Sequence, residues 1–199
     1  MVSLWLEEMD MTELANHADQ QLVQFLVEGF MSGFDIDLSE LLSTSFQCKN
    51  NRSARDAQNV VDDLIKKDLK QSYMTDPLVK PPFDIYRISP IGVAYGKYNR
   101  KPRLIVDLSA PYNYPSHASI NSLIDKEEFS LSYVRLDHAL QVVNSLGVNT
   151  SMVKTDIVDA FKIIPVKPEL RRYLGICWNG FYYFYTRLVF GSGSSLKIL

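Results

Sequence analysis

The strongest local constraint on the fold is the dipeptide Asn179-Gly180, which stands between two runs of aromatic and β-branched residues. Asn-Gly tolerates positive φ at both turn positions, which a two-residue hairpin loop requires. We therefore expect antiparallel strands over 174–178 and 181–186. A similar argument predicts a second hairpin, with strands over 85–95 and 103–108 joined by a basic, polar turn.

Helices alternate irregularly with these hairpins. One apolar stripe at helical spacing predicts a core-facing helix, and its members are Ala57, Val60, Val61, Leu64, Ile65 and Leu69. Amphipathic helices are also expected over 10–30, broken by the two glycines of 29–34, and over 134–146, closed by Gly147. Mixed helices and antiparallel hairpins favour an α+β fold over a parallel doubly wound sheet.

Three further segments complete the expected order. Three prolines make 76–83 extended, because proline is excluded from a helix interior. Residues 36–54 are polar and irregular, which is typical of a linker. Residues 151–156 read as a short strand that ends at an acid.

Charge is distributed unevenly along the chain. Residues 1–48 hold nine acids and no Lys or Arg, so all 21 basic residues follow, although the net charge is only −2. We expect an acidic N-terminal helical segment and linker over 1–54 and a basic unit over 55–199. The basic unit could face a polyanion, or the acidic segment could simply be a solvated face of an ordinary domain.

Other compositional features narrow the class of protein. Cys48 and Cys177 lie far apart without a CxxC partner, so neither a disulfide framework nor a zinc site is expected. There is no run of eighteen apolar residues, and the N-terminus is acidic where a signal peptide is basic. We expect an intracellular protein, cytoplasmic or nuclear, that does not cross a membrane.

The chemistry-bearing stretch is KTDIVDAFKIIPV, residues 154–166. It places Asp156 at the end of a β-type run, followed by a tight turn that carries Asp159, Ala160 and Phe161. A carboxylate suits a hard cation, and turn amides suit phosphate oxygens. An aromatic ring beside them could wall off a sugar. The simpler alternatives are a strand-end cap for Asp156 and a core aromatic for Phe161.

Five ordered blocks give this stretch its context: SPIGV at 89–93, KPRLIVDLS at 101–109, SIN at 119–121, the motif above, and 171–195. Together they resemble the fingers and partial palm of a retroelement reverse transcriptase, of the DIRS-like or gypsy-like type. The resemblance implies a right-hand polymerase fold and an RNA-directed DNA polymerase, a nucleotidyltransferase of the DNA/RNA polymerase superfamily. Its implied partners are a template-primer of RNA or DNA and a dNTP.

The resemblance also implies roles for individual residues. Asp156 would be the first catalytic aspartate and a ligand of two Mg²⁺ ions, with the carbonyl of Ile157 as a second ligand. The amides of Asp159 and Ala160 would contact the triphosphate. Phe161 would be the steric gate that excludes a 2′-hydroxyl.

The remaining nucleotide contacts implied by the resemblance are Lys97 and Arg103 on the fingers hairpin, and Phe190 and Gly191 beside the template. Arginine suits such a role because its planar guanidinium can stack and fork at once. Without the resemblance, the hairpin tip would be merely solvated and FGSGSS merely a flexible turn. The sequence also departs from the family, with Gly96 where a lysine is usual and Leu196 where proline is usual.

No Tyr-x-Asp-Asp string, which carries the family's other catalytic carboxylates, occurs in the 199 residues. We therefore expect a truncated fold that does not polymerise DNA alone and that depends on a partner polypeptide to supply or cover the missing palm. The alternative is a non-enzymatic nucleic-acid-binding or partner-binding module. Two basic sets would then grip phosphates, namely Lys97, Arg100, Lys101 and Arg103, and Lys162, Lys167, Arg171 and Arg172.

Overall fold

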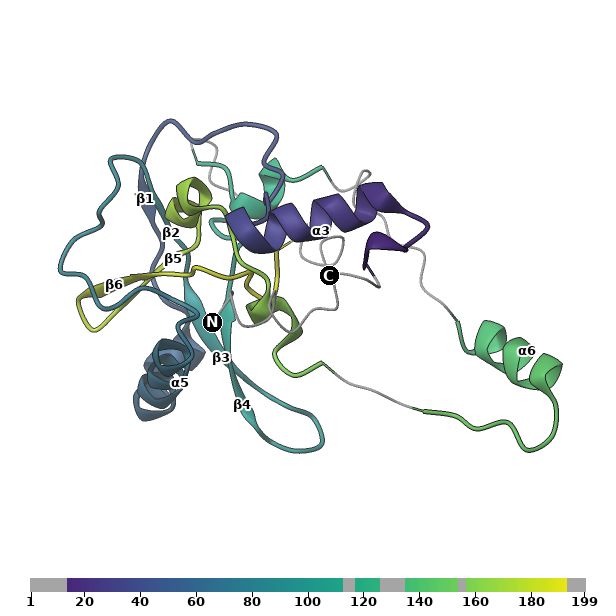
Figure 1. The fold of residues 1–199 in the computed structure, drawn as a ribbon. Helices are drawn as coiled ribbons and strands as arrows, with labels where there is room; N and C mark the ends of the chain where they lie inside the picture. The colour runs from purple at the N-terminus through teal and green to yellow at the C-terminus, as the bar shows by residue number, and fades with distance from the viewer. Residues whose placement is uncertain (1–13, 113–116, 126–134, 154–156, 193–199) are drawn as a thin grey trace.

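The computed structural model describes residues 14–112, 117–125, 135–153 and 157–192, and its fold is a mixed α+β arrangement around two sheets (Figure 1). The larger sheet has the strand order β1-β2-β5-β6, and the smaller sheet is the hairpin β3–β4. The strands are β1 (Phe46–Gln47), β2 (Arg87–Ile88), β3 (Ile91–Tyr95), β4 (Pro102–Val106), β5 (Gly175–Trp178) and β6 (Phe181–Phe184). The helices are α3 (Gln20–Ser32), α4 (Arg52–Arg55), α5 (Gln58–Lys70), η1 (Ile120–Leu123), α6 (Leu136–Leu146), η2 (Ala160–Ile163) and η3 (Pro168–Tyr173).

The hairpin predicted around Asn179-Gly180 is confirmed. β5 and β6 pair antiparallel, with Trp178 opposite Phe181. Asn179 and Gly180 have φ values of 48° and 80°, which are the positive values that a two-residue turn of this kind needs.

The second predicted hairpin is confirmed only in part, because the expected strand over 85–95 divides at Ser89 and Pro90. β3 pairs with β4 as expected, from Ile91 opposite Val106 to Tyr95 opposite Pro102. β2 instead joins the larger sheet, where it pairs parallel to β1 and to β5. Proline has no N–H for a ladder, so the chain changes sheet at Pro90. The larger sheet is therefore mixed rather than built from antiparallel hairpins alone.

Helix α3 begins within the predicted segment 10–30 and ends two residues beyond it, at Ser32. Gly29 does not break the helix; it is buried because the ring of Phe34 folds back onto it, where a Cβ would lie 2.2 Å from a ring carbon. The helix is capped at Gly33, whose φ of 96° is unfavourable for other residues. A backbone amide of Lys167 would lie 2.4 Å from a Cβ at this position, so Gly33 also permits a close chain crossing.

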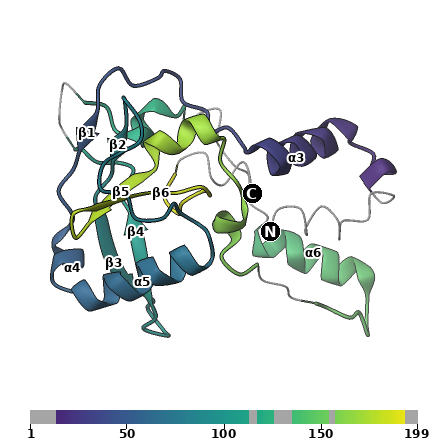
Figure 2. The same ribbon diagram turned by 60° about the vertical axis from the view of Figure 1, so that its left-hand side comes forward.

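Helix α5 confirms the predicted apolar stripe, because Val61 and Ile65 are buried in the main core. The helix packs against β4 and crosses the β3–β4 hairpin in the turned view (Figure 2). Asp68 is buried on the same face, which the spacing of apolar residues does not predict.

The segment 36–54, predicted as a linker, contributes to the fold itself. Ile36 and Ala54 are buried, and Phe46–Gln47 form the first strand of the larger sheet. Asn50 ties the segment to that sheet, since its side-chain amide donates to the carbonyl of Cys177 at 2.8 Å. A division of the chain at residue 54 stays a prediction.

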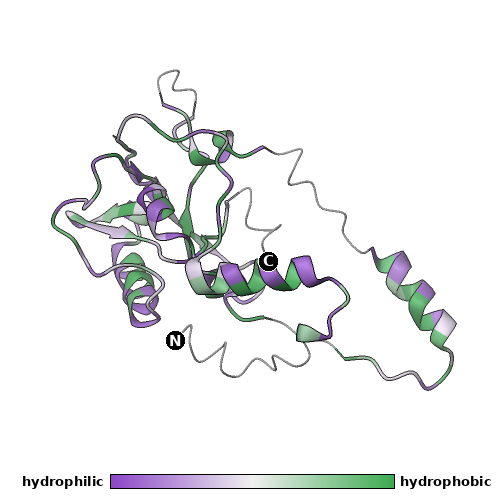
Figure 3. Cartoon of the chain, turned by 45° about the horizontal axis from the view of Figure 1, so that its top comes forward, coloured by the Kyte–Doolittle hydropathy of each residue, from purple (hydrophilic) through white to green (hydrophobic). Residues whose placement is uncertain are grey.

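Helix α6 forms within the predicted bounds and ends at Gly147, whose amide donates to Val143. No residue of α6 is buried, and the helix stands away from the sheets (Figure 3). Its exposed apolar residues are Leu136, Leu140, Val142 and Leu146. Residues 151–153, expected to begin a strand, are exposed and have no strand pairing. Within the described ranges, no helix has the length and apolar character to cross a bilayer.

Candidate nucleotide site

The centre of the candidate site is the turn that enters η2. Asp159 adopts a left-handed conformation with a φ of 53°, which aspartate tolerates better than most residues. Its carbonyl accepts from the amide of Lys162 at 2.7 Å, closing the first turn of η2. Among the residues that the structure describes, the amides of Asp159 and Ala160 have no hydrogen-bond acceptor. Amides in this state are suitable donors for an anionic oxygen.

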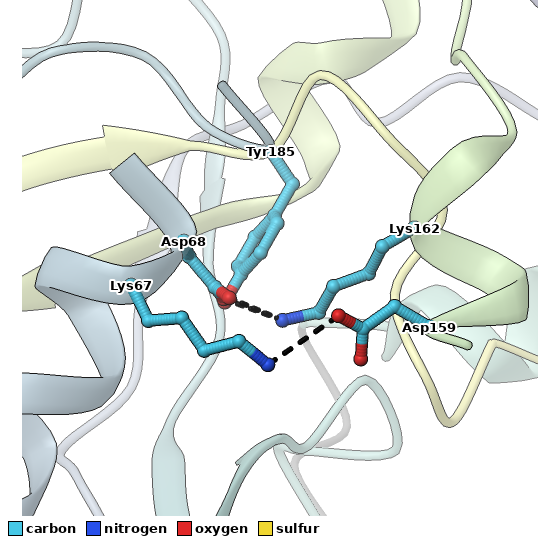
Figure 4. Close-up of polar contacts among 5 residues, drawn as sticks. All are labelled: Lys67, Asp68, Asp159, Lys162 and Tyr185. Atoms are coloured by element: carbon cyan, nitrogen blue, oxygen red, sulfur yellow. Dashed lines mark hydrogen bonds and ion pairs between the residues drawn. The ribbon is translucent and has the colours of Figure 1, made fainter. Parts of the chain in front are cut away.

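Two ion pairs fasten this turn to helix α5 (Figure 4). The ammonium of Lys67 lies 3.3 Å from a carboxylate oxygen of Asp159. One residue further along α5, the buried carboxylate of Asp68 accepts from Lys162 at 2.7 and 2.5 Å. The turn is thus held by alternating charges from two segments about ninety residues apart in the sequence.

Tyr185 completes the buried part of this cluster. Its hydroxyl donates to Asp68 at 3.1 Å. Burial, together with the charge and hydrogen bond of Asp68, raises the pKa of Tyr185 well above 10. The phenol therefore keeps its proton and stays a donor, so Asp68 receives two hydrogen-bonding partners and no buried oxygen of the pair is left without one.

Phe161 and Phe190 come together although they are distant in the sequence. Their ring centroids lie 5.6 Å apart with an interplanar angle of 59°. Phe161 also packs on the main core, whereas the side chain of Phe190 is 61% exposed. Phe161 is therefore partly a core residue. Because it also pairs with an exposed ring, its position is compatible with the predicted steric-gate role.

Asn121 holds Gly191 beside the β4 strand. Its side-chain amide donates to the hydroxyl of Ser109 and to the carbonyl of Gly191, both at 2.8 Å. Ser119 caps η1 by accepting from the amide of Ser122, which fixes Asn121 in place. Three of the predicted blocks, 101–109, 119–121 and 190–191, thus meet at one side chain.

The predicted fingers contacts are both exposed. Arg103 is on β4 opposite Ala94, and Lys97 lies in the hairpin turn. The ammonium of Lys97 lies 5.4 Å from the ring of Tyr98. Neither residue forms an ion pair within the part of the chain described. Their role beside Asp159, Ala160, Phe161, Phe190 and Gly191 stays a prediction.

The metal prediction rests on residues that the structure only partly covers. Asp156 lies outside the described residues, and the side chain of Ile157 is 59% exposed. Elsewhere in the described ranges, no three His, Cys, Asp or Glu side chains gather as a metal site would require. Asp159 is engaged by Lys67. The described residues alone do not fit a Mg²⁺ pair, which needs several carboxylate oxygens.

Sequence reasoning missed Asp68, Tyr185 and Arg87. The acid at position 68 falls on the apolar face of a helix, which is a usable signal that it has a buried partner. Arg87 offers no such signal, because it sits in a two-residue strand. Its guanidinium is fully buried over the ring of Phe46, 5.3 Å from the centroid, and its nitrogens have no hydrogen-bond acceptor among the residues described.

Comparison with known proteins defines the fold but not the family. No protein-family model matches the chain, and no curated protein matches it. Among solved structures, the foamy virus protease–reverse transcriptase in complex with an RNA/DNA hybrid matches with a TM-score of 0.51 and 14% identity, over 94% of this chain. The chain has the fold of part of that protein.

Two further structures of the same viral protein match with lower scores. A selenomethionine-labelled mutant of the prototype foamy virus enzyme gives a TM-score of 0.48 and 18% identity, over 96% of this chain and 25% of its own. The complex with double-stranded DNA gives 0.43 and 20%, over 92% of this chain and 37% of its own. The chain spans about a quarter of the length of the first of these proteins.

Proposed function

We propose that this chain is the fingers and partial palm of a retroelement reverse transcriptase, of the DIRS-like or gypsy-like type, and binds a nucleotide and a nucleic-acid strand. The observation that carries the proposal is the meeting of Phe161 with Phe190 and of Gly191 with Asn121. Phe161, Phe190 and Gly191 were expected to share one nucleotide pocket, and Asn121 comes from another of the five ordered blocks. The fold shared with the foamy virus enzyme supports the same proposal.

In this proposal the η2 turn binds the triphosphate and Phe161 lies under the sugar. The amides of Asp159 and Ala160, which have no acceptor among the described residues, would donate to phosphate oxygens, and the ion pairs to α5 would hold them in place. Asp156, with the carbonyl of Ile157, is proposed to bind Mg²⁺, which would supply charge neutralisation at the phosphates. The polymerase as a whole would need further carboxylates, so the chain alone is proposed to be inactive.

The steric-gate role has a direct test. In an enzyme completed with a palm, Phe161→Ala should lower discrimination between dNTP and rNTP in primer extension, because the ring no longer fills the space of a 2′-hydroxyl. Phe181→Ala is a matched control, since this aromatic is 43% exposed at the distant β5–β6 turn. Unchanged selectivity in Phe161→Ala would contradict the assignment.

Inactivity of the chain alone is tested by incubating the purified protein with template-primer, dNTP and Mg²⁺. No incorporation is expected. Incorporation by the wild type that disappears in Asp156→Asn would show that the chain is a complete polymerase and would overturn this part of the proposal.

A non-enzymatic nucleic-acid-binding module is the second candidate, and the hairpin tip favours it. Lys97, Arg100, Lys101 and Arg103 are exposed, and within the described ranges none of them forms an ion pair. Each phosphate contact should contribute about 0.7–0.9 to the slope of log affinity against log salt. The module predicts normal strand binding in Phe161→Ala together with no nucleotide binding in the wild type.

The matched measurement is fluorescence anisotropy of a labelled oligonucleotide at several salt concentrations. Arg103→Gln should reduce the salt slope by about one contact. Arg52→Gln removes the same charge at a surface site that is already paired with Asp56, and should leave the slope unchanged. Equal slopes for wild type and Arg103→Gln would remove the hairpin from the binding surface.

A further inference from the structure

A second pocket lies away from the Phe161–Phe190 pair, between the end of α3 and the start of η3. Its volume is about 330 Å³. Residues 30–33 form one wall, Pro165 and Pro168 form another, and the side chains of Arg171 and Arg187 line the remainder with Thr186. Both arginines are partly buried. Two partly buried guanidinium groups therefore line one pocket that is partly open to solvent.

These two arginines differ from the lysines around them in how their charge is balanced. Lys162 is bound to Asp68, and Lys167 is bound to Asp35 at 2.9 Å. Among the described residues, Arg171 and Arg187 instead donate to backbone carbonyls, those of Val166 at 3.1 Å and Ile163 at 3.4 Å. In the part of the chain that the structure describes, neither arginine has a carboxylate within ion-pair distance.

The electrostatics of the pocket favour an anion. Burial lowers the pKa of Arg187, and the positive charge of Arg171 lowers it further. Burial also lowers the pKa of Arg171, and among the described acids Glu169 raises it by its charge without forming an ion pair. The last turn of α3 contributes only the partial negative charge of a helix C-terminus, about half an elementary charge. Two full positive charges are thus incompletely neutralised.

The donor count points to the shape of that anion. A guanidinium has five N–H donors, and each arginine here uses one of them on a backbone carbonyl. A carboxylate has two oxygens and is satisfied by a single arginine fork, whereas a phosphate has enough oxygens to accept two forks.

We propose that Arg171 and Arg187 form a phosphate-binding site in the pocket bounded by α3, Pro165 and Thr186. The site is distinct from the proposed nucleotide pocket and needs no polymerase activity. The phosphate could be free or could belong to a nucleic-acid strand, because both present the same tetrahedral oxygens. A strand is reachable if the proposed function holds, and the two sources are separated by the ligand used.

The test titrates the purified full chain with sodium phosphate, and separately with a labelled single-stranded oligonucleotide, each at constant ionic strength. Arg171→Gln and Arg187→Gln should each weaken binding of at least one of these ligands about tenfold or more, because each removes charge-assisted hydrogen bonds. Arg52→Gln is the matched control. It loses the same charge at an exposed site on α4 that is paired with Asp56, and it is not part of the pocket.

Loss with sodium phosphate identifies free phosphate as a ligand, and loss with the oligonucleotide alone identifies a strand. Equal weakening in Arg52→Gln would overturn the site, because it would show a general charge effect. Tighter binding of an oligoglutamate peptide than of both phosphate ligands would also overturn it. If a pocket variant does not fold, the wild type and Arg52→Gln still decide the matter: phosphate must raise their melting temperature above that in chloride at the same ionic strength.

Discussion

Removing the ammonium that pairs with Asp68 should test whether this cluster holds the η2 turn. In Lys162→Met the side chain keeps its length but no longer donates to a carboxylate that is only 4% exposed. Breaking a buried ion pair by removing one partner costs about 3–5 kcal/mol, because the other charge stays buried. The Tyr185 hydroxyl still donates to Asp68, so we expect the lower end, about 3 kcal/mol.

The assay is urea unfolding, supported by a thermal melt. A loss of about 3 kcal/mol corresponds to a fall of about 6–12 °C in melting temperature for a chain of this length. Lys66→Met is the matched control on α5, because its partner Asp63 and its own side chain are both largely exposed. Exposed pairs contribute little, so this variant should melt close to the wild type.

The double variant Asp68→Asn/Lys162→Met separates a buried charge from lost packing. It removes the uncompensated carboxylate, and it should therefore recover most of the stability lost in Lys162→Met. A loss below about 1 kcal/mol in Lys162→Met would refute the reasoning, because it would mean that Asp68 is hydrated rather than buried.

Three further outcomes are expected. Burial raises the pKa of Asp35, but the hydrogen bond and charge of Lys167, together with hydrogen bonds from nearby amides, outweigh burial and lower this pKa. The same side-chain hydrogen bond raises the pKa of Lys167. Wild type should be more stable than Asp35→Asn by less than about 1 kcal/mol. This difference should stay constant from about pH 5 to 10 and shrink as the pH falls through the lowered pKa of Asp35. A pH series of urea midpoints in which the difference does not shrink would contradict this expectation. Arg87→Met should raise the free energy of unfolding by about 1–3 kcal/mol, seen as a higher urea midpoint, because it removes a buried guanidinium that has no acceptor among the described residues. A lower midpoint would show that Arg87 has a partner in solution. Asn121→Ala should cost about 1–2 kcal/mol and speed amide exchange at Gly191, since it loses both 2.8 Å hydrogen bonds.

Local patterns in the sequence predicted local structure well. Asn179-Gly180 determined a hairpin because turn geometry depends on two adjacent residues. The apolar spacing of α5 identified its buried face for the same reason. Periodicity does not say whether a partner covers a face, and the exposed α6 illustrates this limit.

Sequence patterns did not predict the contacts between residues that are far apart in the sequence. The bond between Lys162 and Asp68 spans 94 residues, and β1 joins the sheet through a strand of only two residues. In the candidate site, the contact of Phe161 with Phe190 agrees with the expected order of the blocks, whereas the nucleotide contact of Arg103 stays a prediction. The resemblance supplied an order of segments, and the fold decided which of them touch.

A backbone connection joins the proposed nucleotide site to the proposed phosphate site, so ligand binding at one can affect ligand binding at the other. Pro165 and Arg187 form a bridge, Val166 donates to Thr186 at 3.0 Å, and Leu188 donates to Ile164 at 2.9 Å. The η2 segment and the segment leading to Phe190 therefore carry the proposed nucleotide residues and Arg187, and η3, which holds Arg171, follows η2 directly. If nucleotide binding changes phosphate affinity by some factor, phosphate must change nucleotide affinity by the same factor. A single ladder of hydrogen bonds would then serve as the coupling element, and its stiffness would set the size of that factor.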